Sequence, residues 1–364
     1  MQQLALWDFA DSDLSELQSI QSNDWRWYFK DYPKSNGLKV FSCFSGGGGS
    51  TMGYKLAGYE VVGNCEIDTK MNEIYVHNHR PKYNYCMDLR EFNKHDDLPA
   101  ELYNLDVLDG SPPCTTFSMC GKREKTWGKV KKFREGQVAQ TLDDLLFVFI
   151  GTVSKLCPKV VVMENVEGLI KGAAWSYVQR IYTEFGKIGY KVRHLLLKGE
   201  TMGVPQMRHR VFFIATRLNF DLAKIDLSFN YEPIPFGVIK SKQGFPLLRS
   251  KTMNYLIKNL RYGDSGLDTV CKRLYNKGSF FNNKLVYDNQ VNRTIPAKSA
   301  NIRWDTKEYL SVQDIINSST FPQDFDFINN SHANVNYVCG MSVPPVMMKR
   351  IAIRILESKI FNKD

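Results

Sequence analysis

Several features that sort proteins into broad classes are missing from this sequence. No apolar run is long enough to span a membrane, and no basic stretch precedes the short apolar part of the N-terminus, which argues against a secretory signal. The 8 cysteines include no CxxC pair, so neither a zinc ribbon nor a disulfide framework is indicated. His77 and His79 fall on a predicted helix and are expected at the surface rather than on a metal. We therefore expect a soluble, cytoplasmic protein with reduced thiols, no metal and no membrane partner.

The composition is that of an ordinary globular protein with a surplus of basic residues. At 364 residues the chain is long enough for one large domain and a smaller one. Its formal net charge of +10 favours a polyanionic partner, although charge by itself says nothing about the fold.

Short apolar runs alternate with helical stretches from about residue 38 to residue 217. Strands are predicted at 38–44, 60–67, 105–110, 158–166, 190–198 and 210–216, and helices at 51–59, 141–156 and 174–188. Gly58 suits the left-handed position that ends the first of these helices. Strands separated by helices predict an α/β fold with a doubly wound, largely parallel sheet.

The chain changes character after Arg217. Residues 218–334 are irregular and rich in turn residues, and they predict a second, smaller domain with little helical periodicity. The tail contains a clear amphipathic helix after two prolines, so 37–217 and 335–364 are assigned to the large domain. Residues 1–36 form an N-terminal extension, in which "DWRWYF" is expected to pack on the core rather than touch a ligand.

A glycine loop, "FSGGGGSTMG", joins the first predicted strand to the first predicted helix. Such a loop lets a ligand approach the backbone and points helix N–H groups at it, although a glycine run is equally a flexible turn. Glu66 follows about twenty residues on, where a carboxylate can hold the two hydroxyls of an adenosine ribose. Asp88 and Leu89 form a polar–apolar pair that could grip an adenine ring. Because the loop lacks Gly-Lys-Ser/Thr, a nucleoside without a triphosphate is preferred.

Five blocks, "FSGGGGSTMGYKLAGYEVV", "GSPPCTTFS", "MENVEGL", "QMRHR" and "GMSVPP", occur in this order along the chain. In order and spacing they resemble the blocks of DNA cytosine-C5 methyltransferases of the bacterial and phage restriction-modification type. The resemblance covers roughly residues 38–217 and 335–358. It implies an S-adenosylmethionine-dependent methyltransferase whose large part binds the cofactor, releasing S-adenosylhomocysteine, and whose small part recognises the target sequence.

The resemblance also implies a set of cofactor contacts. By family position these are Phe44, Gly46, Gly47, Gly48, Gly49, Glu66, Ile67, Asp88, Leu89, Ser111, Pro113, Leu145 and Ser342. Three positions depart from the family pattern. Ser42-Cys43 replaces the acidic residue common before the loop's Phe, Thr115 replaces a Gln, and Met341 replaces an Asn. The first and third concern the methionine end of the cofactor.

Cys114 is the expected nucleophile. Cytosine C5 is a poor nucleophile, and attack of a thiolate at C6 converts the ring into an enamine-like species whose C5 can take a methyl group. Cys114 follows two prolines at the carboxyl end of a predicted strand, where doubly wound folds place their active sites. The alternative is a buried structural cysteine, which the accompanying blocks disfavour.

Two further blocks supply the expected proton donor and its neighbours. Glu164 of "ENV" closes the next predicted strand and would protonate the ring near N3. Arg210 of "QMRHR" would brace the base carbonyl, and Arg208 would support the site. Glu164 could instead be a helix N-terminal carboxylate, and either arginine an ordinary ion-pair partner.

A duplex shows the edges of its bases, so the target cytosine must be flipped out before a thiolate reaches its ring. "GKREKTWGKVKKFREGQ" follows the nucleophile and carries seven basic and two acidic residues. We interpret it as a loop that closes over phosphates; its alternative is a solvated surface loop. The expected DNA contacts are Lys122, Arg123, Lys129, Lys131, Lys132 and, in the small domain, Thr269.

Three other functions share parts of this pattern. A tRNA cytosine methyltransferase on the same fold is disfavoured because the middle segment lacks a Cys-Phe-Thr block that such relatives carry. A non-catalytic paralogue would be expected to lose Cys114 or Glu164, and both are present. A nicotinamide dehydrogenase gives the Pro-Pro-Cys and Glu-Asn-Val blocks no role. We expect a monomer acting on double-stranded DNA, and whether a cognate restriction endonuclease accompanies it is left open.

Overall fold

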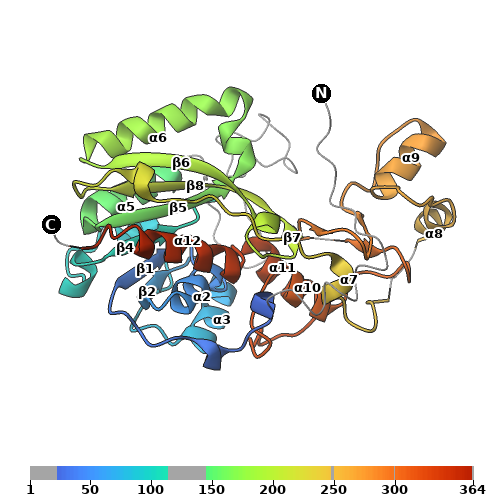
Figure 1. Cartoon of the computed structure of the whole chain (residues 1–364), viewed down its shortest axis with the longest axis horizontal. Coiled ribbons are helices and arrows are strands. Elements are labelled where there is room, and N and C mark those ends of the chain that lie inside the picture. The colour runs from blue at the N-terminus through green and yellow to red at the C-terminus, as the bar shows by residue number, and fades with distance from the viewer. Residues whose placement is uncertain (1–22, 114–144, 247–249, 299, 363–364) are drawn as a thin grey trace. The chain divides into compact units, whose positions relative to one another are not determined.

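A computed structural model describes residues 23–113, 145–246, 250–298 and 300–362 (Figure 1). The chain divides into two compact units. Taking the described residues alone, the sheet unit lies within Asp31–Lys198, His209–Ser228 and Met348–Asp364, and the small unit lies within Met1–Lys30, Gly199–Arg208 and Phe229–Met347. The domain boundaries predicted from the sequence stay a prediction.

Seven strands form one sheet in the sheet unit: β1 (Lys39–Cys43), β2 (Glu60–Cys65), β3 (Tyr83–Tyr85), β4 (Val107–Gly110), β5 (Val160–Val166), β6 (Lys191–Lys198) and β8 (His209–Thr216). Their order is β3-β2-β1-β4-β5-β8-β6, and β8 runs antiparallel to both of its neighbours. Since residues 199–208 are too short a link for a crossover helix, β6 and β8 pair antiparallel. The predicted α/β sheet is confirmed, with β8 as the strand that departs from parallel.

Helices lie on both faces of this sheet (Figure 1). They are α2 (Gly49–Leu56), α3 (Thr69–His79), α4 (Leu89–Phe92), α5 (Leu145–Leu156) and α6 (Trp175–Lys187); α12 (Pro345–Glu357) is shared between the units. A continuous core joins Phe41 and Phe213 of the strands to Phe92, Phe149 and Phe185 of α4, α5 and α6. Gly58, just after α2, has φ 84° as expected. None of the helices in the described ranges is both long and apolar enough to cross a membrane.

The small unit contains more helix than its sequence suggests. Its helices are α7 (Phe236–Ile239), α8 (Lys251–Lys258), α9 (Leu267–Tyr275), α10 (Val312–Ser318) and α11 (His332–Met341). Its strand pairs are β7 (Gln206–Met207) with β10 (Asn292–Arg293) and β9 (Leu285–Val286) with β11 (Ile302–Arg303). The expectation of little helical periodicity is therefore wrong for α8 and α9, whose apolar residues share one buried cluster. Helices of 8 and 9 residues are shorter than the window over which periodicity can be judged.

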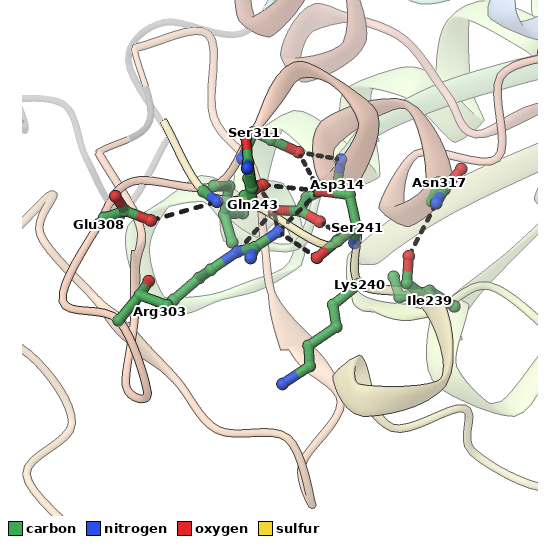
Figure 2. Close-up of polar contacts among 12 residues, drawn as sticks. Ile239, Lys240, Ser241, Gln243, Arg303, Glu308, Ser311, Asp314 and Asn317 are labelled. Carbon is green, nitrogen blue, oxygen red and sulfur yellow. Dashed lines mark hydrogen bonds and ion pairs between the residues drawn. The ribbon is translucent and has the colours of Figure 1, made fainter. Parts of the chain in front are cut away.

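A buried ion pair ties the small unit together (Figure 2). The side chains of Arg303 and Asp314 are 1% and 0% exposed, and Arg303 Nε donates to Asp314 Oδ2 at 2.9 Å. The backbone amides of Ser241 and Ser311 donate to the same carboxylate, each at 2.8 Å. Losing one partner of a buried pair typically costs about 3–5 kcal/mol, so the cluster fixes the start of α10 against β11 and the segment after α7.

Residues 23–30 of the N-terminal extension pack within the small unit, whereas residues 31–36 belong to the sheet unit. Trp25 and Trp27 are 6% and 5% exposed, and Trp27 Nε1 donates to the Thr320 carbonyl at 2.8 Å. The Gln323 amide in turn donates to the Trp27 carbonyl at 2.9 Å. The packing interpretation of "DWRWYF" is thus confirmed for these tryptophans.

Candidate active site

The glycine loop turns sharply between β1 and α2. Gly46 and Gly48 have φ of 52° and 90°, a region that side chains rarely adopt. A Cβ on Gly48 would lie 2.1 Å from His79 Nε2, so the histidine ring occupies the space that any side chain there would need. Gly47 contributes its carbonyl, which lies 3.1 Å from His79 Nε2, and Gly49 begins α2.

His79 corrects one expectation, because it is 7% exposed rather than on the surface. Burial and the nearby Lys55 lower the pKa of His79 to about 3, so the ring is neutral at physiological pH. The position of His79 at the end of α3 places it beneath the loop, and helical spacing by itself could not show which helix face was covered. The histidine supports the loop rather than facing solvent.

Glu66 lies directly after β2 and faces the glycine loop. Its Oε2 accepts from the Gly46 amide at 2.7 Å and its Oε1 from the Asp68 amide at 2.8 Å. Burial raises the pKa of Glu66, while these backbone hydrogen bonds act in the opposite direction. The Ile67 amide is a third backbone donor to Glu66, so about one of the roughly four lone-pair sites of a carboxylate remains for a donor such as a ribose hydroxyl.

A small apolar pocket opens beside this carboxylate. It is a partly open depression lined by Phe44, Cys65, Ile67, Met87, Asp88, Leu89 and Leu145, and the space in and over it, open solvent included, is about 220 Å³. The four residues that the resemblance implies around an adenine, namely Ile67, Asp88, Leu89 and Leu145, all belong to this lining. So does Phe44, which the resemblance implies on the methionine side. Phe44 adopts φ 53°, and the Asp88 carboxylate caps α4 by accepting from the Arg90 amide at 2.8 Å. Cys65 and Met87 were not foreseen.

The Pro-Pro-Cys turn follows the carboxyl end of β4. Ser111 and Pro113 are half-buried, and Asn165 Nδ2 donates to the Pro112 carbonyl at 3.1 Å. This bond joins two blocks that lie 53 residues apart in the chain. Cys114 itself, Thr115 and the basic residues Lys122, Arg123, Lys129, Lys131 and Lys132 lie outside the described residues.

Glu164 and Arg210 form an ion pair on neighbouring strands. Arg210 Nε lies 2.9 Å from Glu164 Oε1, with side-chain exposures of 15% and 11%. Arg210 Nη1 also donates to the His209 carbonyl at 2.7 Å. Glu164 stands at the end of β5 next to Asn165, and its charge acts on Asp109 of the neighbouring strand β4. The alternative of an ion-paired Arg210 is thus realised, with the expected proton donor as its partner.

Three predicted residues belong to the small unit. Arg208 is 3% exposed and donates to the Ile295 and Gly340 carbonyls at 3.3 and 3.1 Å, which is a supporting position. The Ser342 hydroxyl donates to the Val338 carbonyl at 2.8 Å. Thr269 lies on α9 with its hydroxyl 2.9 Å from that of Ser265. The proposed contacts of Ser342 with a cofactor and of Thr269 with DNA stay predictions.

Asp109 is a buried residue of this region that the sequence reasoning passed over. It lies on β4 at 1% exposure, and it accepts a hydrogen bond from the Ser42 hydroxyl at 2.9 Å. A carboxylate within an otherwise apolar strand, directly before the Pro-Pro-Cys block, was the available signal.

The sequence profile of the C-5 cytosine-specific DNA methylase family matches residues 38–357 of this chain. Type II methyltransferase M.HindV of Haemophilus influenzae is 35% identical over 183 residues, covering 50% of this chain and 54% of its own length. Type II methyltransferase M.AplI of Arthrospira platensis is 24% identical over 363 residues, covering 96% of this chain and 90% of its own length.

Other matches are partial or concern the fold alone. The matched part spans about half the length of M.HindV and of M.FnuDI from Fusobacterium nucleatum, at 54% and 51%. A mutant form of DNMT2 from Spodoptera frugiperda has a TM-score of 0.61 at 18% identity, covering 90% of this chain and 100% of that one. Because the family profile extends over most of the sequence, this chain belongs to the C-5 cytosine-specific DNA methylase family.

Proposed function

We propose that this protein is a DNA cytosine-5 methyltransferase that modifies a flipped-out cytosine within a specific duplex sequence. Its proposed nucleophile is Cys114, its proton donor Glu164, and its cofactor S-adenosylmethionine. Double-stranded DNA is the proposed substrate, and a monomer is the proposed active form. A cognate restriction endonuclease is consistent with the type II methyltransferases among the relatives.

The single observation that carries this proposal is the link between the Pro-Pro-Cys turn and the Glu-Asn-Val strand. Asn165 donates to the Pro112 carbonyl at 3.1 Å, and its chain neighbour Glu164 pairs with Arg210. The strands therefore bring a carboxyl group and a guanidinium to the same edge of the sheet as this turn. A reaction that builds charge on a ring after thiolate attack needs such groups close to the nucleophile.

The chain's own residues have separate tasks in this proposal. The Cys114 thiolate forms a bond to C6 of the cytosine, and Glu164 gives a proton to N3 as negative charge develops there. Arg210 holds the Glu164 carboxyl at 2.9 Å and would donate to the base carbonyl. Asn165 keeps the turn against β5, so the thiol and the carboxyl keep their spacing. A buried setting excludes water that would compete for these donors.

The residues around the glycine loop fit S-adenosylmethionine, which when bound supplies the methyl group. The pocket lined by Phe44, Ile67 and Leu145 suits an adenine ring, and the Glu66 carboxylate beside it suits a ribose. Gly46 and Gly48 have positive φ, which favours glycine, and as glycines they place no side chain at the tightest part of the loop. Asp88 and Leu89 complete the pocket.

The proposed function is tested by deep sequencing after bisulfite treatment. DNA and total tRNA from cells that express the chain are compared with nucleic acids from cells that express Cys114→Ser. We expect protected cytosines in DNA at one recurring sequence, present with the wild-type chain and lost in the variant. Protection confined to tRNA would replace the DNA proposal by the tRNA alternative, and protection of neither would contradict methyltransferase activity.

Cofactor affinity is expected to depend on Glu66. Replacing Glu66 by alanine removes the carboxylate beside the pocket, and the loss of charge-assisted hydrogen bonds of ~1.5–3 kcal/mol should weaken S-adenosylmethionine binding by about ten-fold or more. Isothermal titration calorimetry measures this change. Glu73→Ala, which removes an exposed carboxylate from α3, is the matched control and should bind as the wild type does. Equal affinities of the two variants would take Glu66 out of the binding site.

A further inference from the structure

A carboxylate with no part in the proposed reaction is buried beneath the glycine loop. Asp109 Oδ2 accepts from the Ser42 hydroxyl at 2.9 Å, and Asp109 Oδ1 accepts from the Tyr54 hydroxyl at 3.4 Å. The Ser50 hydroxyl is a further hydrogen-bond donor to this carboxyl group. Burying a carboxylate is costly even when hydroxyl groups surround it, so its presence calls for a role that repays the cost.

These hydrogen bonds join three elements that carry the candidate site. Ser42 lies on β1, which leads into the glycine loop, and Tyr54 lies on α2, which follows it. Asp109 lies on β4, shortly before Cys114 in the sequence. Two prolines follow Asp109 by three and four residues and stiffen the chain there, so the backbone position of Asp109 bears directly on that of Pro112 and Pro113.

We propose that Asp109 is a positioning residue that sets the glycine loop and the Pro-Pro-Cys turn relative to each other. Its hydroxyl partners on β1 and α2 hold the loop from both sides, while its own strand carries the turn. This inference rests on the proposed function for the identity of the cofactor. It adds a residue that acts through the loop rather than by touching the reacting atoms.

The register of the sheet shows how the carboxylate reaches this place. Ser42 and Asp109 are direct partners across the parallel pair β1 and β4, so their side chains leave the same face. A carboxylate at either position would project into the same space. Ser42 is also where this sequence lacks the acidic residue that precedes the loop's Phe in the resembling family. Exchanging the two residues should therefore preserve the hydrogen bond with its ends reversed.

The ionisation of Asp109 makes the proposal measurable. Burial raises the pKa of Asp109 to about 7, and the charge of Glu164 adds to this rise. The hydrogen bonds from Ser42, Tyr54 and Ser50 lower the pKa but do not offset the burial. The other titratable groups that interact with it are Cys43 on β1, Tyr54 on α2 and Tyr75 on α3.

Only the ionised carboxylate accepts from every one of these hydroxyl groups. Once the carboxyl group is protonated, one of its oxygens becomes a donor, so one hydroxyl must accept instead of donate, and the remaining hydrogen bonds lose the charge that strengthens them. We therefore expect affinity for S-adenosylhomocysteine to rise as the pH rises through about 7. Removing the Ser42 hydrogen bond should raise the pKa of Asp109 and move that midpoint to higher pH, which a purely structural role would not do.

Stability should change in the opposite direction. The pKa of Asp109 in the folded protein lies above its ordinary value of 3.8, so the folded state binds more protons between about pH 4 and about pH 7. Stability consequently falls as the pH rises through this window. Asp109→Asn removes part of that fall, because the amide does not ionise.

The test measures S-adenosylhomocysteine binding by calorimetry between pH 5.5 and 8.5 for the full chain, at about half-unit steps, with thermal unfolding recorded for every variant. At the upper end of the range, Asp109→Asn should bind about ten-fold more weakly than the wild type, as expected for a lost charge-assisted hydrogen bond, and without the pH dependence. The exchange Ser42→Asp with Asp109→Ser should recover most of the affinity. Ser42→Ala should bind with its midpoint moved upward.

A control at the residue before the same strand separates a positioning role from an effect on protein stability. Asp106 lies just before β4, is 7% exposed and pairs with Lys159 at 2.7 Å. Asp106→Asn should lower the unfolding temperature while the binding profile keeps its midpoint.

Wild-type affinity and pH dependence in Asp109→Asn would overturn the proposal, as would a folded exchange variant that binds no better than Asp109→Asn. If Asp109→Asn fails to fold, Ser42→Ala provides the test, and a pH midpoint of S-adenosylhomocysteine binding equal to that of the wild type would likewise overturn the proposal. Because the assay contains no nucleic acid, these outcomes are independent of whether the wild type methylates DNA. Absence of any wild-type binding would overturn both the inference and the proposed cofactor.

Discussion

Replacing Cys114 by serine is expected to abolish covalent capture of DNA that carries 5-fluorocytosine. After the thiolate has bonded to C6 and C5 has been methylated, release of the enzyme requires loss of a proton from C5. Fluorine at C5 leaves no proton to remove, so the wild-type chain should stay bonded to the DNA through denaturing electrophoresis. A serine hydroxyl is far less ionised than a thiol near neutral pH, and turnover should fall on the order of 10⁴-fold or more.

The matched control for this experiment is Cys157→Ser. Cys157 is an exposed thiol that follows α5 and precedes β5, at the amino edge of the sheet rather than the carboxyl edge where active sites of this fold lie. The control should form the adduct as the wild type does. Cys114→Ser should still bind DNA, since phosphate contacts supply much of the affinity. An adduct that survives Cys114→Ser would show that another residue is the nucleophile.

Replacing Glu164 by glutamine is expected to slow methyl transfer by about 10²–10⁴-fold, the range associated with losing a general acid. The amide can accept or donate a hydrogen bond near N3 but cannot give up a proton there. In the wild type the Arg210 guanidinium lies 2.9 Å from the Glu164 carboxylate, and the amide leaves this guanidinium without its charged partner. Single-turnover kinetics with excess enzyme measure the chemical step apart from product release.

Two variants separate proton donation from the ion pair. Glu164→Asp keeps a carboxyl group on a shorter side chain and should retain more activity than Glu164→Gln. Glu167→Gln removes a neighbouring carboxylate that pairs with Lys171 at 2.7 Å, and it should react at close to the wild-type rate. Equal rates for Glu164→Gln and the wild type would assign the protonation of N3 to another group.

The buried carboxylates of this fold show why the site could be only partly foreseen. Glu66 was predicted because a carboxylate about twenty residues beyond a glycine loop is a pattern along the chain itself. Asp109 was not predicted, since its hydrogen bonds to Ser42 and Tyr54 depend on strand register and helix placement across 67 and 55 residues. His79 was expected at the surface because a helix pattern shows which residues share a face but not which element covers that face.

Local sequence patterns also explain which strands and helices could be predicted from the sequence. Buried strands appear as continuous apolar runs, so β1, β2, β4, β5 and β8 were foreseen. The half-buried β6 was foreseen from its own short apolar run. The direction of β8 was not, because pairing direction depends on how the link through residues 199–208 returns the chain to the sheet. Helices α8 and α9 are too short for their periodicity to be recognised before the tertiary packing of their apolar faces is known.

The sequence by itself determined the α/β class, the order of the functional blocks and the chemical character of Cys114, Glu164 and Glu66, because these depend on residue type and on spacing along the chain. Only the tertiary structure decided that Arg210 pairs with Glu164, that Asn165 holds the Pro-Pro-Cys turn, and that Ser42 meets Asp109. Each of these contacts joins strands that are neighbours in the sheet but distant in the chain. Their distances follow from the register of hydrogen-bonded backbones, which no stretch of sequence carries within itself.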